Sequence, residues 1–85
     1  MNIYMLKNFS LQEVYFGLSE NDVHQAVKAH KGNQDSPVAH WEFEKEEIKW
    51  GIVQGDLSEV YAQAFLQALR REPTEDGWIL VMGFD

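Results

Sequence analysis

The amino-acid sequence predicts a small α+β domain over residues 1–85, with the order β-β-α-β-α-β and two helices packed against a small antiparallel or mixed sheet. The length of 85 residues fits a single domain. A hydrophobic content of 45% supports one core rather than a disordered chain. Along the chain, the spacing of apolar residues changes several times between the period of a strand and that of a helix.

Two alternating segments open the chain. Residues 2–7 place their apolar side chains alternately on two faces, which is the period of a strand. Residues 13–18 alternate again and contain β-branched and aromatic residues. Because only a short polar connection separates the segments, we expect an antiparallel hairpin. Gly17 inside the second strand indicates a close backbone approach or a bulge.

The first helix is expected to start at Ser19 and to end near His30. Ser19 and Asp22 have the spacing of a capping box, with Asp in place of the usual Glu or Gln. Gly32 follows as a stop signal, and the polar residues 31–37 predict an exposed loop. The apolar face of this helix has 3-1-3 spacing and consists of Val23, Ala26, Val27 and His30.

The middle of the chain is less regular. Residues 38–47 alternate weakly and fit an extension of the next strand, a separate edge strand or a loop. Residues 48–53 alternate well and predict the third strand. The acidic run 42–47 fits a solvated face better than a docking patch for a basic partner. Of the three tryptophans, we expect Trp50 and Trp78 in the core and Trp41 at an interface.

The strongest helical period runs from Leu57 to Leu69. Asp56 or Ser58 can cap this second helix, and Pro73 ends it because proline disfavours helical geometry in the residue before it. Residues 78–82 are apolar on both faces and predict a buried final strand, which at a sheet edge would pair between two copies. The expected core stripe of the second helix is Val60, Tyr61, Ala64, Phe65 and Leu69.

The composition excludes several classes of function. The absence of Cys rules out a disulfide scaffold, a thiol nucleophile and Cys-ligated zinc. The net charge of −7 argues against a partner held by phosphate neutralisation, so we do not expect nucleic-acid binding. The first residues do not resemble a signal peptide, and the longest strongly apolar run is too short to span a bilayer. We therefore expect a cytoplasmic protein without membrane contact.

Two short motifs carry a resemblance to a known family. A hairpin bearing Asn2-Ile3-Tyr4 and then Tyr15-Phe16-Gly17 resembles the GIY-YIG nuclease domain. A helix ending in a histidine, a third strand at 48–53 and a helix start at 58–62 follow in the family's order, so the resemblance covers residues 1–69. It implies the family's fold and its chemistry, metal-assisted phosphodiester hydrolysis by two tyrosines, an arginine and a glutamate. The matching motif residues are Tyr4, Tyr15 and Gly17.

The two charged parts of the family's site have no match in this sequence. The arginine position falls on Ala26, or on Gln25 if the register shifts by one. The glutamate position falls on Ala64, with Gln63 beside it. The arginine stabilises charge on the phosphate and the glutamate holds the divalent ion, so their loss removes the main catalytic contributions. The resemblance thus implies a GIY-YIG-like fold without nuclease activity.

The candidate remnant site consists of Tyr4, Tyr15, Gly17, His24 and Lys28, and we assign no catalytic residue, metal or cofactor. His24 and His30 are six residues apart, a spacing that does not place them on one helical face for metal binding. A competing interpretation makes Tyr4 and Tyr15 cross-strand aromatic partners that stabilise the hairpin. The resemblance requires both tyrosines on neighbouring strands, with the first helix packed beside them.

Three hypotheses for the function follow. The first is a non-catalytic GIY-YIG-like domain with a binding or assembly role, whose partner is a protein or a second copy. The second is an active nuclease, or one whose site has relocated to Glu59 and His24. The third is an unrelated small α+β protein-interaction domain whose motif match is accidental.

Overall fold

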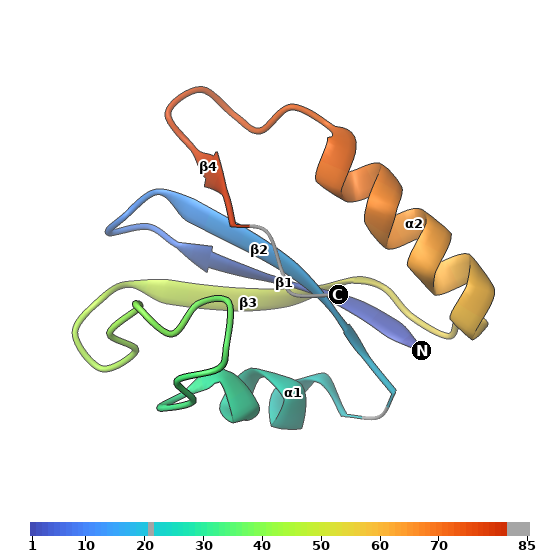
Figure 1. Cartoon of the computed structure of the whole chain (residues 1–85), viewed down its shortest axis with the longest axis horizontal. Helices are drawn as coiled ribbons and strands as arrows, with labels where there is room; N and C mark the ends of the chain where they lie inside the picture. Colours follow the sequence, from blue (N-terminus) through green and yellow to red (C-terminus); the bar gives the residue numbers. More distant parts are fainter. Residues whose placement is uncertain (21, 82–85) are drawn as a thin grey trace.

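The computed structural model describes residues 1–20 and 22–81. This part of the chain forms a four-stranded mixed sheet in the order β3-β1-β2-β4, together with two helices (Figure 1). The α+β class and the predicted order of elements are confirmed. No helix in the described ranges is long and apolar enough to cross a membrane. The elements are β1 (Asn2–Asn8), β2 (Glu13–Ser19), α1 (Val23–His30), β3 (Ile48–Gln54), α2 (Glu59–Arg71) and β4 (Ile79–Leu80).

Strand β1 lies at the centre of the fold. It pairs antiparallel with β2 on one side and with β3 on the other. The two helices cover opposite faces of the sheet, so alternate residues of β1 enter two different layers (Figure 1). Leu6 on the α1 side and Ile3 on the opposite side are both fully buried. The alternation predicted for residues 2–7 therefore serves two half-cores rather than one core and one solvated face.

The half-core on the α1 side includes a segment that has no regular structure. Residues 31–47 fold as successive turns over this face of the sheet, which settles the assignment of residues 38–47 as a loop. Val38 is fully buried there, and Trp41 is 5% exposed. The prediction of Trp41 at an interface is therefore wrong. The expected core tryptophans are instead more exposed, since Trp78 is half-buried and Trp50 is 44% exposed at the sheet edge.

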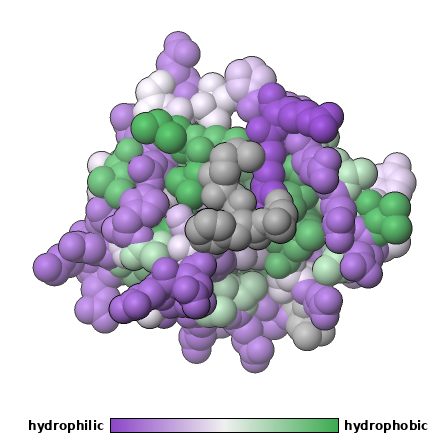
Figure 2. All heavy atoms as spheres, viewed as in Figure 1, coloured by the Kyte–Doolittle hydropathy of each residue, from purple (hydrophilic) through white to green (hydrophobic). Residues whose placement is uncertain are grey.

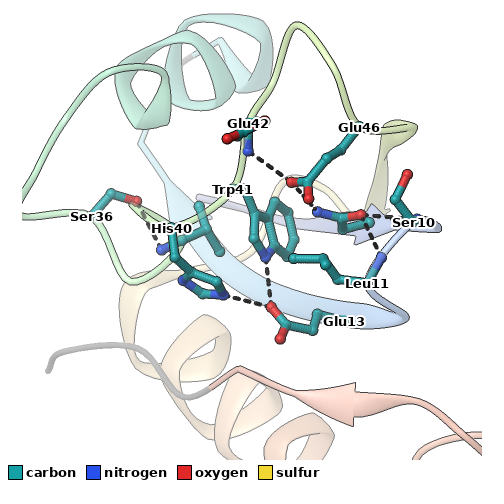
Figure 3. Close-up of polar contacts among 10 residues, drawn as sticks. Ser10, Leu11, Glu13, Ser36, His40, Trp41, Glu42 and Glu46 are labelled. Carbon is teal, nitrogen blue, oxygen red and sulfur yellow. Dashed lines mark hydrogen bonds and ion pairs between the residues drawn. The ribbon is translucent and has the colours of Figure 1, made fainter.

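A buried asparagine, Asn8, links this loop to the turn of the hairpin by hydrogen bonds, and Figure 3 labels its partners Ser10, Leu11 and Glu46. Asn8 is fully buried, and its Oδ1 accepts hydrogen bonds from the backbone N–H groups of Ser10 and Leu11, both at 3.0 Å. Its Nδ2 donates to Glu46 Oε1 at 3.0 Å, and the same oxygen accepts the backbone N–H of Glu42 at 2.7 Å. The acidic run is thus not simply a solvated face, because one of its carboxylates forms part of the internal polar network.

Helix α1 begins later than predicted. Ser19 still belongs to β2, where it is paired with Asn2, so it does not cap the helix. Asp22 is the N-cap, and its carboxylate accepts the backbone N–H of His24 at 2.9 Å. Gly32 lies just beyond the last turn with φ of 71°, a left-handed conformation that glycine adopts without steric cost.

Helix α2 has the predicted ends but buries a different face. Ser58 caps its start by accepting the backbone N–H of Tyr61 at 3.3 Å, and the helix stops before Pro73. The predicted core stripe is wrong at its first positions, because Val60 is 83% and Tyr61 67% exposed. Ala64 is exposed as well. The buried side of the helix is formed by Ala62 and Leu66, with Phe65 and Leu69 half-buried beside them.

The last strand is shorter and more exposed than predicted. Strand β4 comprises two residues, pairs in parallel with β2 at the sheet edge, and exposes 60% of Ile79. Because one of its sides has no neighbouring strand in the described ranges, it does not become the buried strand that two apolar faces indicated. Residue 82, the end of the predicted strand, lies outside the described residues.

Gly17 makes the close approach that the sequence predicts. It lies opposite Tyr4 in the β1–β2 register, and the tyrosine ring covers it. A Cβ atom at Gly17 would lie 2.5 Å from both Cζ and the hydroxyl oxygen of Tyr4. Any side chain at this position would therefore displace the ring.

We expect Gly17→Ala to lower the free energy of unfolding by about 1–3 kcal/mol, because the added methyl group overpacks the tyrosine ring. Urea denaturation monitored by circular dichroism measures this change. Gly51→Ala is the matched control, since no atom lies within 4 Å of a Cβ at this strand position. Equal effects of the two substitutions would contradict the proposed contact.

Candidate functional site

The two motif tyrosines lie side by side on neighbouring strands. Tyr4 is on β1 and Tyr15 on β2, and their ring centroids are 6.3 Å apart in an edge-to-face arrangement with an interplanar angle of 61°. Val23 and Val27 of α1 pack against the same cluster. The placement of strands and helix that the resemblance requires is therefore present.

His30 joins the tyrosines at the end of α1. Its Nε2 lies 2.6 Å from the hydroxyl oxygen of Tyr4, and its Nδ1 lies 2.6 Å from Oγ of Ser36. The Ser36 hydroxyl also accepts the backbone N–H of Val38 at 3.2 Å. A neutral imidazole has one N–H and one lone pair, so it satisfies both bonds in either tautomer. The result is a continuous hydrogen-bonded chain from the sheet through the helix end to the loop.

Burial keeps the Tyr4 and His30 side chains of this hydrogen-bonded series uncharged. It raises the pKa of the Tyr4 phenol well above its ordinary value, with a smaller contribution from neighbouring Tyr15. Burial also lowers the pKa of the His30 imidazole. The Tyr4 side chain is almost inaccessible, at 3% residue exposure. A phenol in this state holds its neighbours in place, whereas activation of a water molecule requires access to solvent or substrate.

Of the other residues of the predicted site, Gly17 lies at this cluster, and His24 and Lys28 lie away from it. Gly17 is beneath the Tyr4 ring, as described. His24 is exposed and stacks on Trp50 of β3, with ring centroids 5.9 Å apart and an interplanar angle of 27°. Lys28 is exposed on α1. The structure therefore brings Tyr4, Tyr15 and Gly17 together and places both basic candidates at the surface.

The positions that correspond to the missing charges are also separated. Ala26, to which the resemblance assigns the arginine position, is half-buried and packs against the tyrosine cluster. Ala64 is exposed on α2, which covers the opposite face of the sheet (Figure 1). Glu59 is on the same helix and is also exposed. The sheet thus lies between the tyrosines and both positions of α2 that the sequence associated with the site.

A second polar cluster lies where β2 begins (Figure 3). Glu13 Oε1 accepts the indole N–H of Trp41 at 2.7 Å and lies 2.6 Å from Nε2 of His40. Burial by itself raises the pKa of the Glu13 carboxyl, but the hydrogen bonds from Trp41 and His40 outweigh it and hold this pKa below its ordinary value. An ionised carboxylate therefore anchors the buried indole of the loop to the sheet.

The three histidines have separate roles. His30 bonds to Tyr4, His24 stacks on Trp50, and His40 contacts Glu13. Across residues 1–20 and 22–81, no three His, Asp or Glu side chains come together in a way that could hold a metal ion.

Comparisons with known proteins assign no family to this geometry. No family model matches the chain, and neither the curated proteins nor the solved structures include a significant match. The GIY-YIG resemblance therefore stays a prediction from the motif residues of the sequence.

We expect Tyr4→Phe to lower the free energy of unfolding by about 1–3 kcal/mol, because His30 then loses the hydroxyl partner of its Nε2 in a partly buried site. Urea denaturation at neutral pH measures this loss. The control is Tyr61→Phe, which removes a hydroxyl from an exposed ring on α2 and leaves stability within about 0.5 kcal/mol. Unchanged stability of the Tyr4 variant would rule out a stabilising hydrogen bond.

Stability is expected to fall on acidification through the titration of His30. Its folded pKa lies below the ordinary value of 6.5, so the unfolded chain binds the proton first as the pH falls. The contribution of neutral His30 is therefore complete above about pH 6.5, declines below it, and levels off below the folded pKa.

Urea midpoints from slightly alkaline to mildly acidic pH measure this dependence. His30→Gln should flatten the decline, whereas His24→Gln, which alters an exposed histidine on the same helix, should retain it. An identical decline in the wild type and the His30 variant would contradict the assignment.

Proposed function

We propose that this chain is a non-catalytic GIY-YIG-like domain with a binding or assembly role in the cytoplasm. The observation that carries the proposal is the state of Tyr4. Its phenol is buried, un-ionised and hydrogen-bonded to His30, so it stabilises the fold instead of facing a substrate. Tyr15 packs edge-on against both rings.

The surroundings of the tyrosines support the same conclusion. Phosphodiester hydrolysis of the family's type needs a cation for the charge on phosphate and a carboxylate for the metal ion. The position beside the tyrosines that corresponds to the arginine is Ala26, which packs as an apolar residue. The glutamate position, Ala64, lies on the helix across the sheet. Neither Ala26 nor Ala64 supplies a charged side chain to the two tyrosines.

A binding role agrees with the surface of the domain. Several large apolar side chains are exposed, notably on β3 and in the first turn of α2, and Figure 2 shows hydrophobic areas between the hydrophilic residues of the visible face. The net charge of −7 disfavours a phosphate backbone as the partner and favours a protein. The most exposed of these side chains on the two elements are Trp50, Ile52, Val60 and Tyr61.

A plasmid-nicking assay with Mg²⁺ or Mn²⁺ tests the absence of catalysis. We expect supercoiled DNA to remain intact at the level of a protein-free control. Tyr4→Phe and Tyr15→Phe should show the same background as the wild type, which identifies any residual cleavage as contamination. Cleavage that requires the divalent ion and disappears in either tyrosine variant would overturn the proposal in favour of an active nuclease.

A further inference from the structure

We propose that the open edge of β3 pairs with the β3 strand of a second copy, antiparallel and with the two-fold axis at Gly51. The pairing would join two four-stranded sheets into one continuous sheet. It names a partner for the binding or assembly role and rests on that proposed function. The supporting observations are an unpaired strand edge, exposed apolar side chains on it, and its lack of acidic residues.

The edge itself is available for pairing. Strand β3 pairs with β1, and in residues 1–20 and 22–81 no strand pairs with its other side. Such an edge presents backbone N–H and C=O groups that another strand can bind. With seven residues, β3 is much longer than β4, the two-residue strand at the opposite edge. The longer edge offers the larger number of hydrogen bonds.

The backbone pattern shows which residues face outward. The N–H of Phe9 donates to the carbonyl oxygen of Glu47 at 2.8 Å, which makes this a hydrogen-bonded pair of the β1–β3 ladder. Because such pairs alternate in antiparallel sheets, residues 49 and 51 also bond toward β1. The backbone groups of Ile48, Trp50 and Ile52 therefore point to the open edge.

The same strand exposes apolar side chains. Trp50 is 44% and Ile52 59% exposed, opposite Leu6 and Tyr4 in the register with β1. A two-fold axis at Gly51 places Trp50 of each copy directly opposite Ile52 of the other, on the same face of the joined sheet. Aromatic residues paired with β-branched residues across strands are favourable contacts. The two-fold axis therefore produces this Trp50–Ile52 contact twice, and the contacts cover both side chains in each copy.

Charge favours a second copy over a basic partner. The chain has 14 acidic residues, yet residues 48–55 contain none. Lys49 is the single charged residue of this stretch, and its Nζ lies 5.6 Å from the centroid of the Phe9 ring of its own chain. Within residues 48–54 two copies therefore meet without opposing carboxylates, and Asp56 of each copy comes opposite Glu46 of the other only at the ends of the pairing. A basic protein would find no acid to bind within residues 48–54. The nearest acids, Glu47 and Asp56, flank the two ends.

Gly51 suits the position on the axis. It has no side chain, and a Cβ built on it meets no atom within 4 Å. Since residues 51 bond toward β1 in each copy, they would form a non-hydrogen-bonded pair, in which Cα atoms approach to about 4.5 Å. The open space around this position leaves room for an opposing strand.

Sedimentation equilibrium of the full chain tests the dimer. We expect a monomer–dimer equilibrium that higher salt strengthens, because salt screens the repulsion between two acidic copies. Ile52→Lys should raise the dissociation constant at least about tenfold. Val60→Lys places the same charge on an exposed apolar residue of α2, with Val60 83% and Ile52 59% exposed, and should leave the dissociation constant unchanged. Circular dichroism should show both variants folded. A monomer at all concentrations, or equal effects of the two variants, would overturn the proposal.

Disulfide trapping tests the register. The chain has no Cys, so Gly51→Cys carries one thiol per copy, and about 4.5 Å between Cα atoms falls within the disulfide range of roughly 4.4–6.8 Å. Lys49→Cys is the control, because its two copies would lie four residues apart along the strands, roughly 13 Å. Oxidation should link the residue-51 variant alone, and equal linking of both would refute the register.

The two proposals fail separately. A concentration-independent monomer would refute the β3 pairing but would not affect the proposed non-catalytic role, which the nicking assay tests separately. Tyrosine-dependent nicking by a dimeric chain removes the non-catalytic role and leaves the pairing intact.

Discussion

The hydrogen bond between Tyr4 and His30 connects the three parts of this molecule that the sequence leaves far apart. The tyrosine ring lies across Gly17, which brings its hydroxyl to the end of α1. His30 then continues the contact to Ser36 at the start of the buried loop. The ring has room because the neighbouring strand lacks a side chain at Gly17, so this glycine is a condition of the Tyr4–His30 hydrogen bond.

Periodicity in the sequence predicts the elements of this fold better than their buried faces. Residues 2–7, 13–18 and 48–53 all form strands, since alternation depends on local geometry. Helix α2 also forms between its predicted caps. Its apolar residues, however, extend over more than one side, and the pattern does not specify which side meets the sheet. Ala62 and Leu66 are buried while Val60 and Tyr61 face solvent, because α2 packs against β1 and β2 through the side that carries Ala62 and Leu66.

The candidate site was predictable only where motifs are local. Tyr4, Tyr15 and Gly17 meet as expected because two strands joined by a short turn must pair. The partners Ser36, His40 and Trp41 come from a loop without a period, and the contact from Trp41 to Glu13 spans 28 positions. Trp41 lies in an acidic, irregular segment, so its sequence context predicts a surface residue. Its burial becomes understandable once Glu13 is known to accept the indole N–H. Sequence spacing carries no information about such distant pairs.

The central position of β1 also has a consequence for biosynthesis. This strand is translated before β3, yet it needs β3 along one edge, and the carbonyl of Met1 accepts the N–H of Leu57 at 2.9 Å. Until the ribosome has released the third strand, the nascent chain has a two-stranded ribbon with apolar residues on both faces, an arrangement of marginal stability in water. The central layer of the sheet therefore cannot close before residues 48–57 are available, and until then the hairpin leaves apolar side chains uncovered.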